Sequence, residues 1–380
     1  MFSKIILIGN YLPDNQESMI RFTQLLKKEF SKQGVDTEIW WPTVVVGNIV
    51  KSTSTGIGKW LGYLDKYLIF PVVLKFRMMN SRLKNPAVKF HICDHSNAPY
   101  LKYLPSAQTS ITCHDVIAIR GALGYSDSYQ PASVMGKYLQ KWIMGHLKFA
   151  TSIAFVSQHS FDQFRELVPA PLTKKNWCVI YTSFNNDFKP MDKIVAREKV
   201  IAAGINADIP FLLHVGSSSI RKNRALLLDM ANQLNSRQKI NICYAGESLD
   251  KELIAHANTI GLSPQVISIV KPDHQTLIAL YSMCAAFIFP SLSEGFGMPL
   301  IEAQACGAVV IASSNNPMPE VSGGAALHYN PKNPQDFACG FETLKNEGLR
   351  QQLIQEGFKN CLRYQGIIMI KQYQDFINLN

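Results

Sequence analysis

The chain has 380 residues, of which 47% are hydrophobic and 17% charged, and it carries a net charge of +10. This length exceeds one ordinary hydrophobic core, and the sequence contains no low-complexity tract or solenoid repeat, so we expect two globular domains rather than a disordered or repeat protein. The longest apolar runs are far shorter than the roughly 20 residues that span a bilayer, so we expect no transmembrane helix.

The cysteines and the first residues indicate a cytoplasmic location. The chain begins with a strand-like segment rather than with the long apolar core of a signal peptide. The cysteines are scattered singly, without the C-x-x-C pair that is typical of zinc or redox sites, and we expect reduced, mostly buried thiols. They are Cys93, Cys113, Cys178, Cys243, Cys284, Cys306, Cys339 and Cys361.

The positive charge is confined to the first half of the chain. Residues 1–190 contain 22 Lys and Arg against 12 Asp and Glu, whereas residues 191–380 contain 16 of each. The densest segment, Lys59–Lys84, combines six cations and one acid with aromatic and aliphatic residues. Such a mixture suits contact with anionic lipid headgroups at the inner face of a membrane. A core helix with a solvated basic face explains the same pattern.

The first half opens as a βαβ unit. A strand is expected at 4–9, followed by a helix whose apolar stripe ends before Gly34, and then by a second strand at 37–41. Later apolar runs, each followed by polar residues, are typical of buried parallel strands whose carboxyl ends carry chemistry. These runs lie at 89–93, 108–113 and 152–156.

The second half alternates strands and helices in the manner of a doubly wound α/β domain. The expected strands lie at 211–215, 240–245, 266–270, 286–290 and 309–312. Turn-forming residues at 185–190 mark a linker. We therefore expect a first domain over 1–189, a second over 190–362, and a terminal helix over 363–380 that returns to the first domain.

The segment 285–307 carries the most informative pattern. It combines a strand, a glycine-containing loop, and a helix that begins near Pro299 and stops at Gly307. A helix N-terminus at the end of a strand binds anions such as a diphosphate. Glu294 and Glu302 bracket this loop, where carboxylates would accept hydrogen bonds from sugar hydroxyls. Compensation of the helix dipole is the simpler explanation for Glu302 alone.

The stretches EGFGMPLIEAQACG at 294–307 and PMPEVSGGAALHYNP at 317–331 resemble the retaining group 1 glycosyltransferases, of glycosyltransferase family 4. The resemblance implies the GT-B fold, an α/β architecture of two Rossmann-like doubly wound domains facing across a cleft that closes on its substrates. It also implies that Glu294 contacts the donor sugar and takes part in catalysis, and that Glu302 binds the ribose. Backbone amides of the loop would contact the donor at Phe296, Gly297, Met298, Pro299 and Leu300.

A second part of the resemblance lies at 211–228, where a strand ends in Gly216. The family usually has an arginine directly after this glycine and a lysine a few residues later. Here Ser217 takes the place of the arginine and Lys222 matches the lysine, with Arg221 as a substitute cation. We expect Lys222 to stabilise the departing diphosphate, so that no metal or other cofactor is required. An exposed basic turn is the alternative. Val270, at a strand end, completes the expected donor-binding set.

In the first half, the TCHDV stretch at 112–116 resembles the family's His-Asp step, which places His114 near the transferred sugar as a catalytic residue. We expect the acceptor side to include Asp115 together with three residues of HICDHSN at 91–97, namely Asp94, His95 and Asn97. The H-x-x-D-H spacing there leaves a metal site as a weaker alternative. The loop after the first strand lacks the family's usual glycine pair.

The resemblance extends to mannosyltransferases of surface-polysaccharide assembly. We therefore expect transfer of mannose from GDP-mannose, with retention, to a glycan or lipid-linked acceptor by a cytoplasmic enzyme in peripheral contact with an anionic membrane. A UDP-sugar donor, an epimerase or phosphorylase of the same fold, and a catalytically silent nucleotide-sugar-binding subunit remain open. Nucleic-acid binding is not expected, because no recognition motif accompanies the positive charge.

Overall fold

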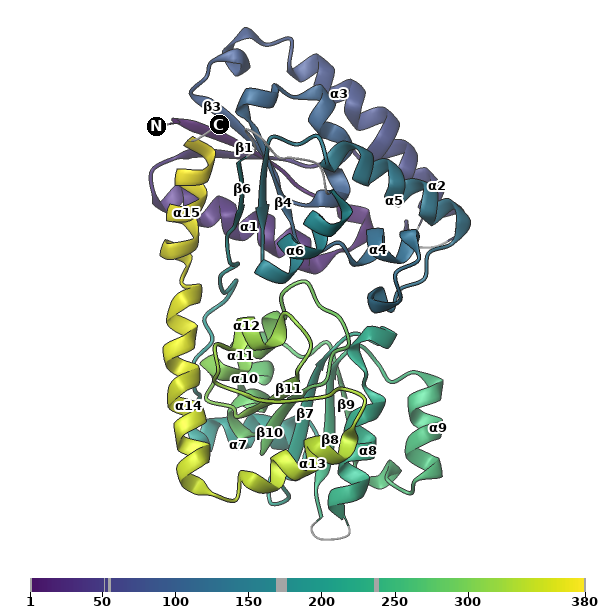
Figure 1. Cartoon of the computed structure of the whole chain (residues 1–380), viewed down its shortest axis with the longest axis vertical. Helices are drawn as coiled ribbons and strands as arrows, with labels where there is room; N and C mark the ends of the chain where they lie inside the picture. The colour runs from purple at the N-terminus through teal and green to yellow at the C-terminus, as the bar shows by residue number, and fades with distance from the viewer. Residues whose placement is uncertain (1, 51, 54–55, 169–175, 236–238, 379–380) are drawn as a thin grey trace. The chain divides into compact units, whose positions relative to one another are not determined.

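The computed structural model describes residues 2–378 except for 51, 54–55, 169–175 and 236–238, and it divides into two compact units (Figure 1). The first unit comprises Met1–Leu123, Ala132–Asn185 and Gly366–Asn380, and the second comprises Gly124–Pro131 and Asn186–Gln365. This division differs from the expected domains, because a short segment near residue 124 belongs to the second unit. Residues 363–365 also remain with the second unit, so the returning segment starts at Gly366.

The first unit is built on a parallel sheet of six strands in the order β2-β1-β3-β4-β5-β6. The strands are β1 (Lys4–Ile8), β2 (Asp36–Trp40), β3 (Val88–Ile92), β4 (Thr109–Cys113), β5 (Ser152–Phe155) and β6 (Asn176–Val179). The first five confirm the expected strands, whereas the edge strand β6 was not expected. Its residues are only half-buried, so they lack the continuous apolar run by which buried parallel strands are found.

Helices cover both faces of this first sheet, since side chains of a strand alternate between its faces. Ile6 and Ile8 lie in one core with residues of α3 and α5, and Ile5 and Leu7 lie in another with residues of α1 and α15. The helices are α1 (Glu17–Lys32), α2 (Gly56–Leu64), α3 (Phe70–Arg77), α4 (Ile117–Leu123), α5 (Val134–Leu147), α6 (Gln158–Leu167) and α15 (Gly366–Asn378).

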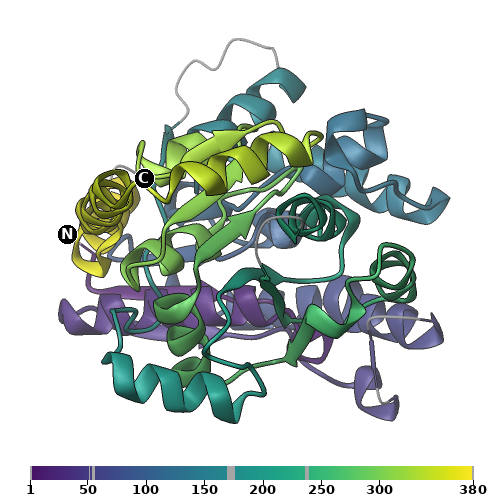
Figure 2. The ribbon, with the colours of Figure 1, turned by 90° about the horizontal axis from the view of Figure 1, so that it is seen from below.

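Helix α15 brings the end of the chain onto the first sheet. Its Ile370 and Tyr373 are fully buried, and the Tyr373 hydroxyl lies 2.8 Å from Thr112 Oγ1 on β4. The two views show α15, in yellow, beside the start of the chain (Figures 1 and 2). A hydrogen bond of 3.4 Å from the Phe2 amide to Asn378 Oδ1 joins the two ends.

The second unit repeats the architecture with a parallel sheet in the order β12-β11-β10-β7-β8-β9. The strands are β7 (Phe211–Gly216), β8 (Asn241–Gly246), β9 (Val266–Val270), β10 (Ala286–Phe289), β11 (Val310–Ser313) and β12 (Leu327–Tyr329). All expected strands of this half are confirmed, and the short edge strand β12 is an addition. The helices are α7 (Lys193–Ala202), α8 (Ala225–Asn235), α9 (Lys251–Thr259), α10 (His274–Met283), α11 (Met298–Ala305), α12 (Met318–Ser322), α13 (Pro334–Thr343) and α14 (Glu347–Cys361).

The sequence predicts that the chain has no transmembrane helix and that its thiols are reduced and mostly buried. Within the described residues we find no helix whose length and hydrophobicity suffice to cross a bilayer. The eight cysteines are free, and Cys339 is exposed, whereas the others are buried or half-buried.

Candidate active site

The strand order of the second unit fixes where a ligand can bind. Strand β7 lies at the centre, with β8 and β9 on one side of it and β10, β11 and β12 on the other. The loops that follow the neighbouring strands β7 and β10 therefore run toward opposite sides. In open α/β sheets this divergence leaves a crevice beyond the carboxyl ends of the two strands, where ligands bind.

The loop after β10 leads into α11 through a glycine. Gly297 has φ +101°, a left-handed conformation that side chains rarely adopt, and a Cβ atom there would lie 3.2 Å from the Phe289 ring. Among the described hydrogen bonds, the amides of Gly297 and Met298 have no protein acceptor. Pro299 has no N–H, and the Leu300 amide donates to the Gly297 carbonyl at 3.0 Å. Only part of the expected loop therefore offers amides to a ligand.

The loop after β7 is tied to the loop after β10. A short 3₁₀ turn, Ile220–Lys222, ends at Asn223 in the left-handed conformation (φ 52°). The Leu292 amide donates to the Arg221 carbonyl at 2.7 Å, and Asn223 Nδ2 donates to the Pro290 carbonyl at 3.2 Å. These bonds hold the two loops in one arrangement.

Two cations of this turn converge on one carboxylate. Lys222 Nζ lies 2.6 Å from Glu294 Oε1, and Arg221 Nη1 lies 2.7 Å from Glu294 Oε2. The side chains of Lys222 and Glu294 are 10% and 7% exposed, whereas that of Arg221 is 24% exposed. The three residues form a charged cluster that is buried on one side and reaches solvent through Arg221.

The ion pairs determine the charge state of Glu294. Burial alone would raise the pKa of this carboxyl group, but the neighbouring Lys222 and Arg221 outweigh that effect and hold the pKa below its usual range. Burial lowers the pKa of Lys222, and the attraction of Glu294 opposes this shift. A carboxylate offers about four lone-pair sites, so Glu294 can also accept hydrogen bonds from ligand hydroxyls.

Glu302 lies on α11 and is oriented by a residue that the sequence did not indicate. The hydroxyl of Tyr281, on α10, donates to Glu302 Oε2 at 3.2 Å, and both residues are buried. Burial raises the pKa of Tyr281 well above its usual value, so this hydroxyl keeps its proton. The partnership crosses two helices, and no local spacing predicts it.

Not every expected donor-binding residue lies at the cluster. Gly216 ends β7, and Ser217 follows it half-buried, so both lie at the crevice. The ring of Phe296 packs on Tyr364, with centroids 5.6 Å apart. Val270 is 55% exposed at the end of the edge strand β9, and β8 separates that strand from β7.

The first unit has a corresponding point of divergence between β1 and β3, and it gathers most of the expected acceptor residues. Asn10 Nδ2 donates to Asp94 Oδ2 at 2.6 Å, and Asn97 Nδ2 donates to Asn10 Oδ1 at 3.0 Å. His95 Nδ1 lies 3.1 Å from Asp94 Oδ1. Burial would lower the pKa of His95, but Asp94 raises it overall. Asn10, which no sequence motif indicates, joins the two loops.

His114 and Asp115 follow the next strand, β4. His114 Nε2 lies 2.9 Å from the Cys93 carbonyl, which can only accept, so Nε2 carries the proton and Nδ1 is left as an acceptor. Burial lowers the pKa of His114, so the ring is neutral at pH 7. Asp115 Oδ1 accepts from the Ile117 amide at 2.9 Å, which holds Asp115 in the turn that leads into α4.

The structure gives no support to a metal site at the H-x-x-D-H motif. His91 is fully buried in β3, where its ring nitrogens lie 2.8 Å from Ser110 Oγ and 2.9 Å from Thr112 Oγ1. Its ring is therefore occupied within the sheet. Across the part of the chain that the structure describes, we find no group of three or more His, Cys, Asp or Glu side chains that could hold a metal ion.

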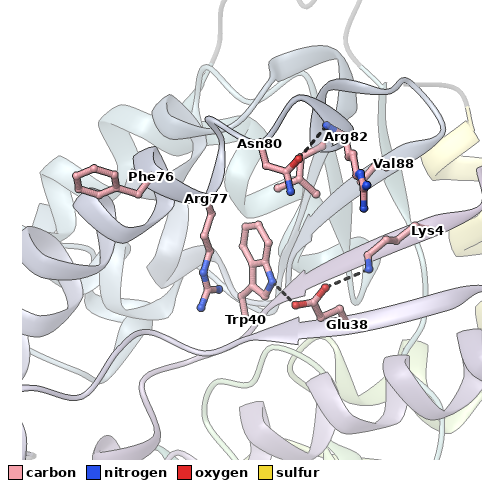
Figure 3. Close-up of a pocket in the computed structure, with 9 residues that line it drawn as sticks. Lys4, Glu38, Trp40, Phe76, Arg77, Asn80, Arg82 and Val88 are labelled. Carbon is pink, nitrogen blue, oxygen red and sulfur yellow. Dashed lines mark hydrogen bonds and ion pairs between the residues drawn. The ribbon is translucent and has the colours of Figure 1, made fainter.

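A hollow of about 550 Å³ lies elsewhere, on the first unit beside α3 (Figure 3). Arg77 lies alongside the Trp40 ring there, with its guanidinium carbon 4.6 Å from the ring centroid. Glu38 accepts from Trp40 Nε1 and pairs with Lys4. No residue of the expected donor or acceptor sets lines this hollow.

Comparison with known proteins shows that most of the second unit is similar to a described family of domains. Residues 196–360 match the family model of the group 1 glycosyl transferases. This stretch contains Arg221, Lys222, Glu294 and Glu302, that is, the charged cluster and the acidic residue of α11.

Curated relatives match over longer parts of the chain at modest identity. A serotype-specific mannosyltransferase WbdA of Escherichia coli is 27% identical over 65% of this chain. The matched region spans only 30% of that relative's length. The O-antigen chain mannosyltransferase RfbU of Salmonella typhimurium is 24% identical over 81% of this chain and 78% of its own.

Solved structures match the whole chain. Sucrose-phosphate synthase from Thermosynechococcus elongatus aligns over 99% of both chains with a TM-score of 0.75 and 19% identity. Anabaena HepE, in complex with UDP and glucose, aligns over 100% of both chains with a TM-score of 0.71 and 14% identity. With two parallel six-stranded sheets and this likeness, the chain has the GT-B fold.

Proposed function

We propose that this chain is a retaining glycosyltransferase that transfers mannose from GDP-mannose to a glycan or lipid-linked acceptor in polysaccharide biosynthesis. The observation that carries the proposal is the convergence of Lys222 and Arg221 on Glu294 at the strand-order divergence of the second unit. The match of residues 196–360 to the group 1 glycosyl transferases supports the reaction class.

In the proposed reaction, the diphosphate of the donor lies against Lys222, Arg221 and the amides of Gly297 and Met298 at the start of α11. These groups stabilise the negative charge that develops on the departing nucleoside diphosphate. Glu294 accepts hydrogen bonds from donor-sugar hydroxyls, and Glu302 accepts them from the ribose. The protein supplies its cations from side chains, so we propose that the reaction needs no metal ion.

We assign mannose on the strength of the relatives, since both WbdA and RfbU are named mannosyltransferases. We assign guanine because the resemblance of residues 317–331 to mannosyltransferases favours GDP-mannose. A UDP-sugar is the second candidate donor, because HepE, a protein of the same fold, was crystallised with UDP and glucose. The fold is common to both possibilities, so the choice rests on contacts to the base and the sugar.

We assign the acceptor to the first unit, at the loops after β1 and β3. The network of Asn10, Asp94 and Asn97 provides amide and carboxylate groups that suit a sugar hydroxyl. His114 contributes its Nδ1 as a further acceptor for a sugar hydroxyl. The free cysteines suit the reducing cytoplasm, where we place the reaction.

A catalytically silent nucleotide-sugar-binding subunit is disfavoured by the position of Arg221. Ser217 stands where the family usually has an arginine, and this replacement favours a silent subunit, as does the missing glycine pair after the first strand. The contact of 2.7 Å from Arg221 to Glu294 supplies a second cation to the cluster. We therefore propose that Arg221 takes over the function of the missing arginine.

The nucleotide is identified by thermal stabilisation, because a ligand that binds the native state raises the melting temperature. The protein is melted with GDP, UDP, ADP, GDP-mannose and UDP-glucose in turn. We expect the melting temperature to rise with GDP and GDP-mannose only. If it rises with UDP and UDP-glucose only, the donor is a UDP-sugar. A protein that responds to none of these ligands would contradict the proposed donor site.

A further inference from the structure

An exposed apolar stripe runs along the first unit. Helix α2, a π-helical turn at Asp65–Ile69 and helix α3 form one continuous helical stretch from residue 56 to residue 77. A large apolar side chain is exposed at each turn of this stretch. The six are Ile57, Trp60, Leu64, Leu68, Val72 and Phe76, with exposed fractions between 44% and 78%.

The opposite side of the same helical stretch is firmly anchored. Phe70 and Leu74 are fully buried in the core of the first sheet. Asp65 is fully buried in the π-helical turn, where it accepts hydrogen bonds from Tyr11 Oη and from the amides of Val45, Val46 and Gly47. The helix therefore has a fixed rotation, and the apolar stripe faces solvent because the other side is held.

The π-helical turn keeps the stripe straight. Apolar residues four positions apart drift around a regular α-helix, which has 3.6 residues per turn. A turn with i to i+5 bonding contains more residues and cancels part of that drift between Leu64, Leu68 and Val72. Such turns are frequent at functional sites.

Helix α5 extends the apolar surface. Val134, Tyr138 and Trp142 are exposed at successive turns of α5, on one side of that helix. The ring of Trp142 packs against Tyr67 of the π-helical turn, with centroids 5.0 Å apart. Figure 1 shows α5 beside α2 and α3 at the edge of the first unit. We call this surface of α2, α3 and α5 the apolar-basic face.

The charges of the apolar-basic face are of one sign. Lys59, Lys75, Lys137 and Lys141 are exposed on its helices, and none of them forms an ion pair with a described residue. Between Glu38 and Asp94 the sequence contains a single acid, the buried Asp65, and between Asp127 and Asp162 it contains none. The face therefore presents cations beside apolar side chains without a compensating acid.

The hollow beside α3 is also lined by cationic side chains. It is lined by Phe76 of the stripe, by Arg77 and Arg82, and by Glu38, whose charge is paired with Lys4 (Figure 3). Arg77 Nη1 is buried and has no hydrogen-bond partner among the described residues. A guanidinium group in this position suits a phosphate oxygen.

We propose that the apolar-basic face docks on the surface of an anionic lipid bilayer, with the stripe inserted among the headgroups and the lysines paired with lipid phosphates. Helices with Lys on the polar side and Trp, Phe and Leu on the other bind such surfaces in the plane of the membrane. Self-association through this face is disfavoured, because a two-fold contact would bring Lys59 and Lys75 toward a second set of cations.

This inference goes beyond the proposed reaction and does not depend on it. A protein that docks on a bilayer through this face needs no particular donor, and a glycosyltransferase needs no bilayer to bind its nucleotide. The two proposals therefore have separate readouts, namely vesicle binding and nucleotide-induced thermal stabilisation.

The test is co-sedimentation of the full chain with vesicles of phosphatidylcholine alone and with vesicles that also contain phosphatidylglycerol. Two double variants, Leu68→Ser with Phe76→Ser and Lys59→Glu with Lys75→Glu, alter the stripe and its charge. Their matched controls lie on exposed residues of the second unit, Ile194→Ser with Ile201→Ser and Lys193→Glu with Lys251→Glu. Melting temperatures with and without nucleotide show that each variant is folded and retains its donor site.

We expect the wild-type chain to bind the anionic vesicles at low salt, to bind neutral vesicles much less, and to be released by added salt. Each test variant should bind about tenfold more weakly, because it loses apolar contacts or attraction to the lipid phosphates, whereas the controls should bind as the wild type does. The fluorescence of Trp60 and Trp142 should shift to shorter wavelength on binding, and a Trp60→Phe, Trp142→Phe variant should lose most of the shift.

The proposal is overturned if the wild-type chain ignores anionic vesicles at low salt. It is equally overturned if the control variants lose as much binding as the test variants. Sedimentation velocity tests whether the face binds a second copy of the chain instead. If the wild-type chain does not bind vesicles but forms a dimer, and the Leu68→Ser, Phe76→Ser variant is a monomer, the face is a dimer interface.

Discussion

Lys222 and Glu294 lie 72 residues apart in the sequence, yet Lys222 Nζ and Glu294 Oε1 are separated by 2.6 Å in a nearly dry environment. The contact is possible because each residue belongs to the loop after one of two neighbouring strands, β7 and β10. Arg221 binds the other oxygen of the same carboxylate. The cluster therefore fixes two cations beside the place where we propose that the donor diphosphate binds.

The first prediction concerns the stability of this cluster. Glu294→Gln should lower the free energy of unfolding by about 3 kcal/mol, because it leaves the buried Lys222 without its charged partner. Lys222→Met should lower it by less, because Glu294 keeps its ion pair with Arg221. The double variant should lose less than the sum of the two, and urea unfolding of all four proteins measures the difference. The exposed pair of Arg197 and Asp208 is the control, with a much smaller coupling. Additive losses at the cluster would show that the contact contributes nothing.

The second prediction separates the two acidic residues of the donor loop. Glu294→Gln should lower kcat by about 100-fold, because it changes contacts at the reacting sugar. Glu302→Gln should act mainly on the KM for the donor, since we assign this residue to the ribose. Tyr281→Phe should raise the same KM about fivefold, which corresponds to the loss of roughly one hydrogen bond. Steady-state kinetics with varied donor resolve these effects, and equal, full activity in all three variants would exclude the assignments.

The third prediction tests whether Arg221 replaces the arginine that the family usually has at position 217. Arg221→Ala should reduce kcat by about 100-fold through the loss of charge stabilisation. Adding Ser217→Arg to this variant should restore part of the activity, because the new guanidinium would reach the same crevice. Arg197→Ala, an exposed arginine on α7, serves as the unaffected control. If the Arg221→Ala enzyme has the kcat of the wild type, Arg221 has no role in catalysis and is part of an exposed basic turn.

The fourth prediction concerns pH. His214 is buried on β7, its Nδ1 donates to the Ile288 carbonyl at 3.1 Å, and burial lowers its pKa to about 3. The unfolded chain has a histidine pKa of about 6.5, so between pH 6.5 and 3 the unfolded state binds one more proton and stability falls with falling pH. The loss is about 1.4 kcal/mol per pH unit for this group.

Replacing His214 by Asn keeps a donor for the Ile288 carbonyl and removes the titration. His214→Asn should therefore lose about 2 kcal/mol less stability than the wild type between pH 7 and pH 5, as measured by urea unfolding at both pH values. His91, which also has a pKa lowered to about 3 by burial, remains in both proteins and keeps part of the acid sensitivity. The same loss in both proteins would indicate that His214 is not buried in its neutral form.

The elements of the fold were largely predictable, because buried parallel strands and amphipathic helices leave local periodic patterns. The strand expected at 211–215 is observed as β7 over Phe211–Gly216, and the helix expected near Pro299 begins at Met298. Strand β12, Leu327–Tyr329, was missed because a three-residue, half-buried edge strand has no period to detect. The return of α15 to the first sheet was expected because a helical segment continues after the last strand-like run of the second half.

The site was predictable where motif residues carry it, and not where tertiary contacts do. Glu294 was named from its place between a strand and a helix, and Lys222 and Arg221 were named from the resemblance at 211–228; the structure brings the three together. Tyr281 was missed because it reaches Glu302 from another helix. Asn10 was missed because its partner, Asp94, lies 84 residues away. The number of N–H groups that the loop offers to a ligand was overestimated. Pro299 has none, and the Leu300 amide already donates within the chain, which motif matching does not show.

The central claim is that the diphosphate of the donor binds at Lys222, Arg221 and the start of α11. Isothermal titration calorimetry tests it most directly, using the nucleoside diphosphate that stabilises the protein most, with the wild-type chain and an Arg221→Ala, Lys222→Ala variant that melts cooperatively. We predict that the wild type binds GDP and that the variant binds it at least tenfold more weakly, because two charge-assisted contacts to phosphate are lost. Equal affinity in the two proteins would contradict the account.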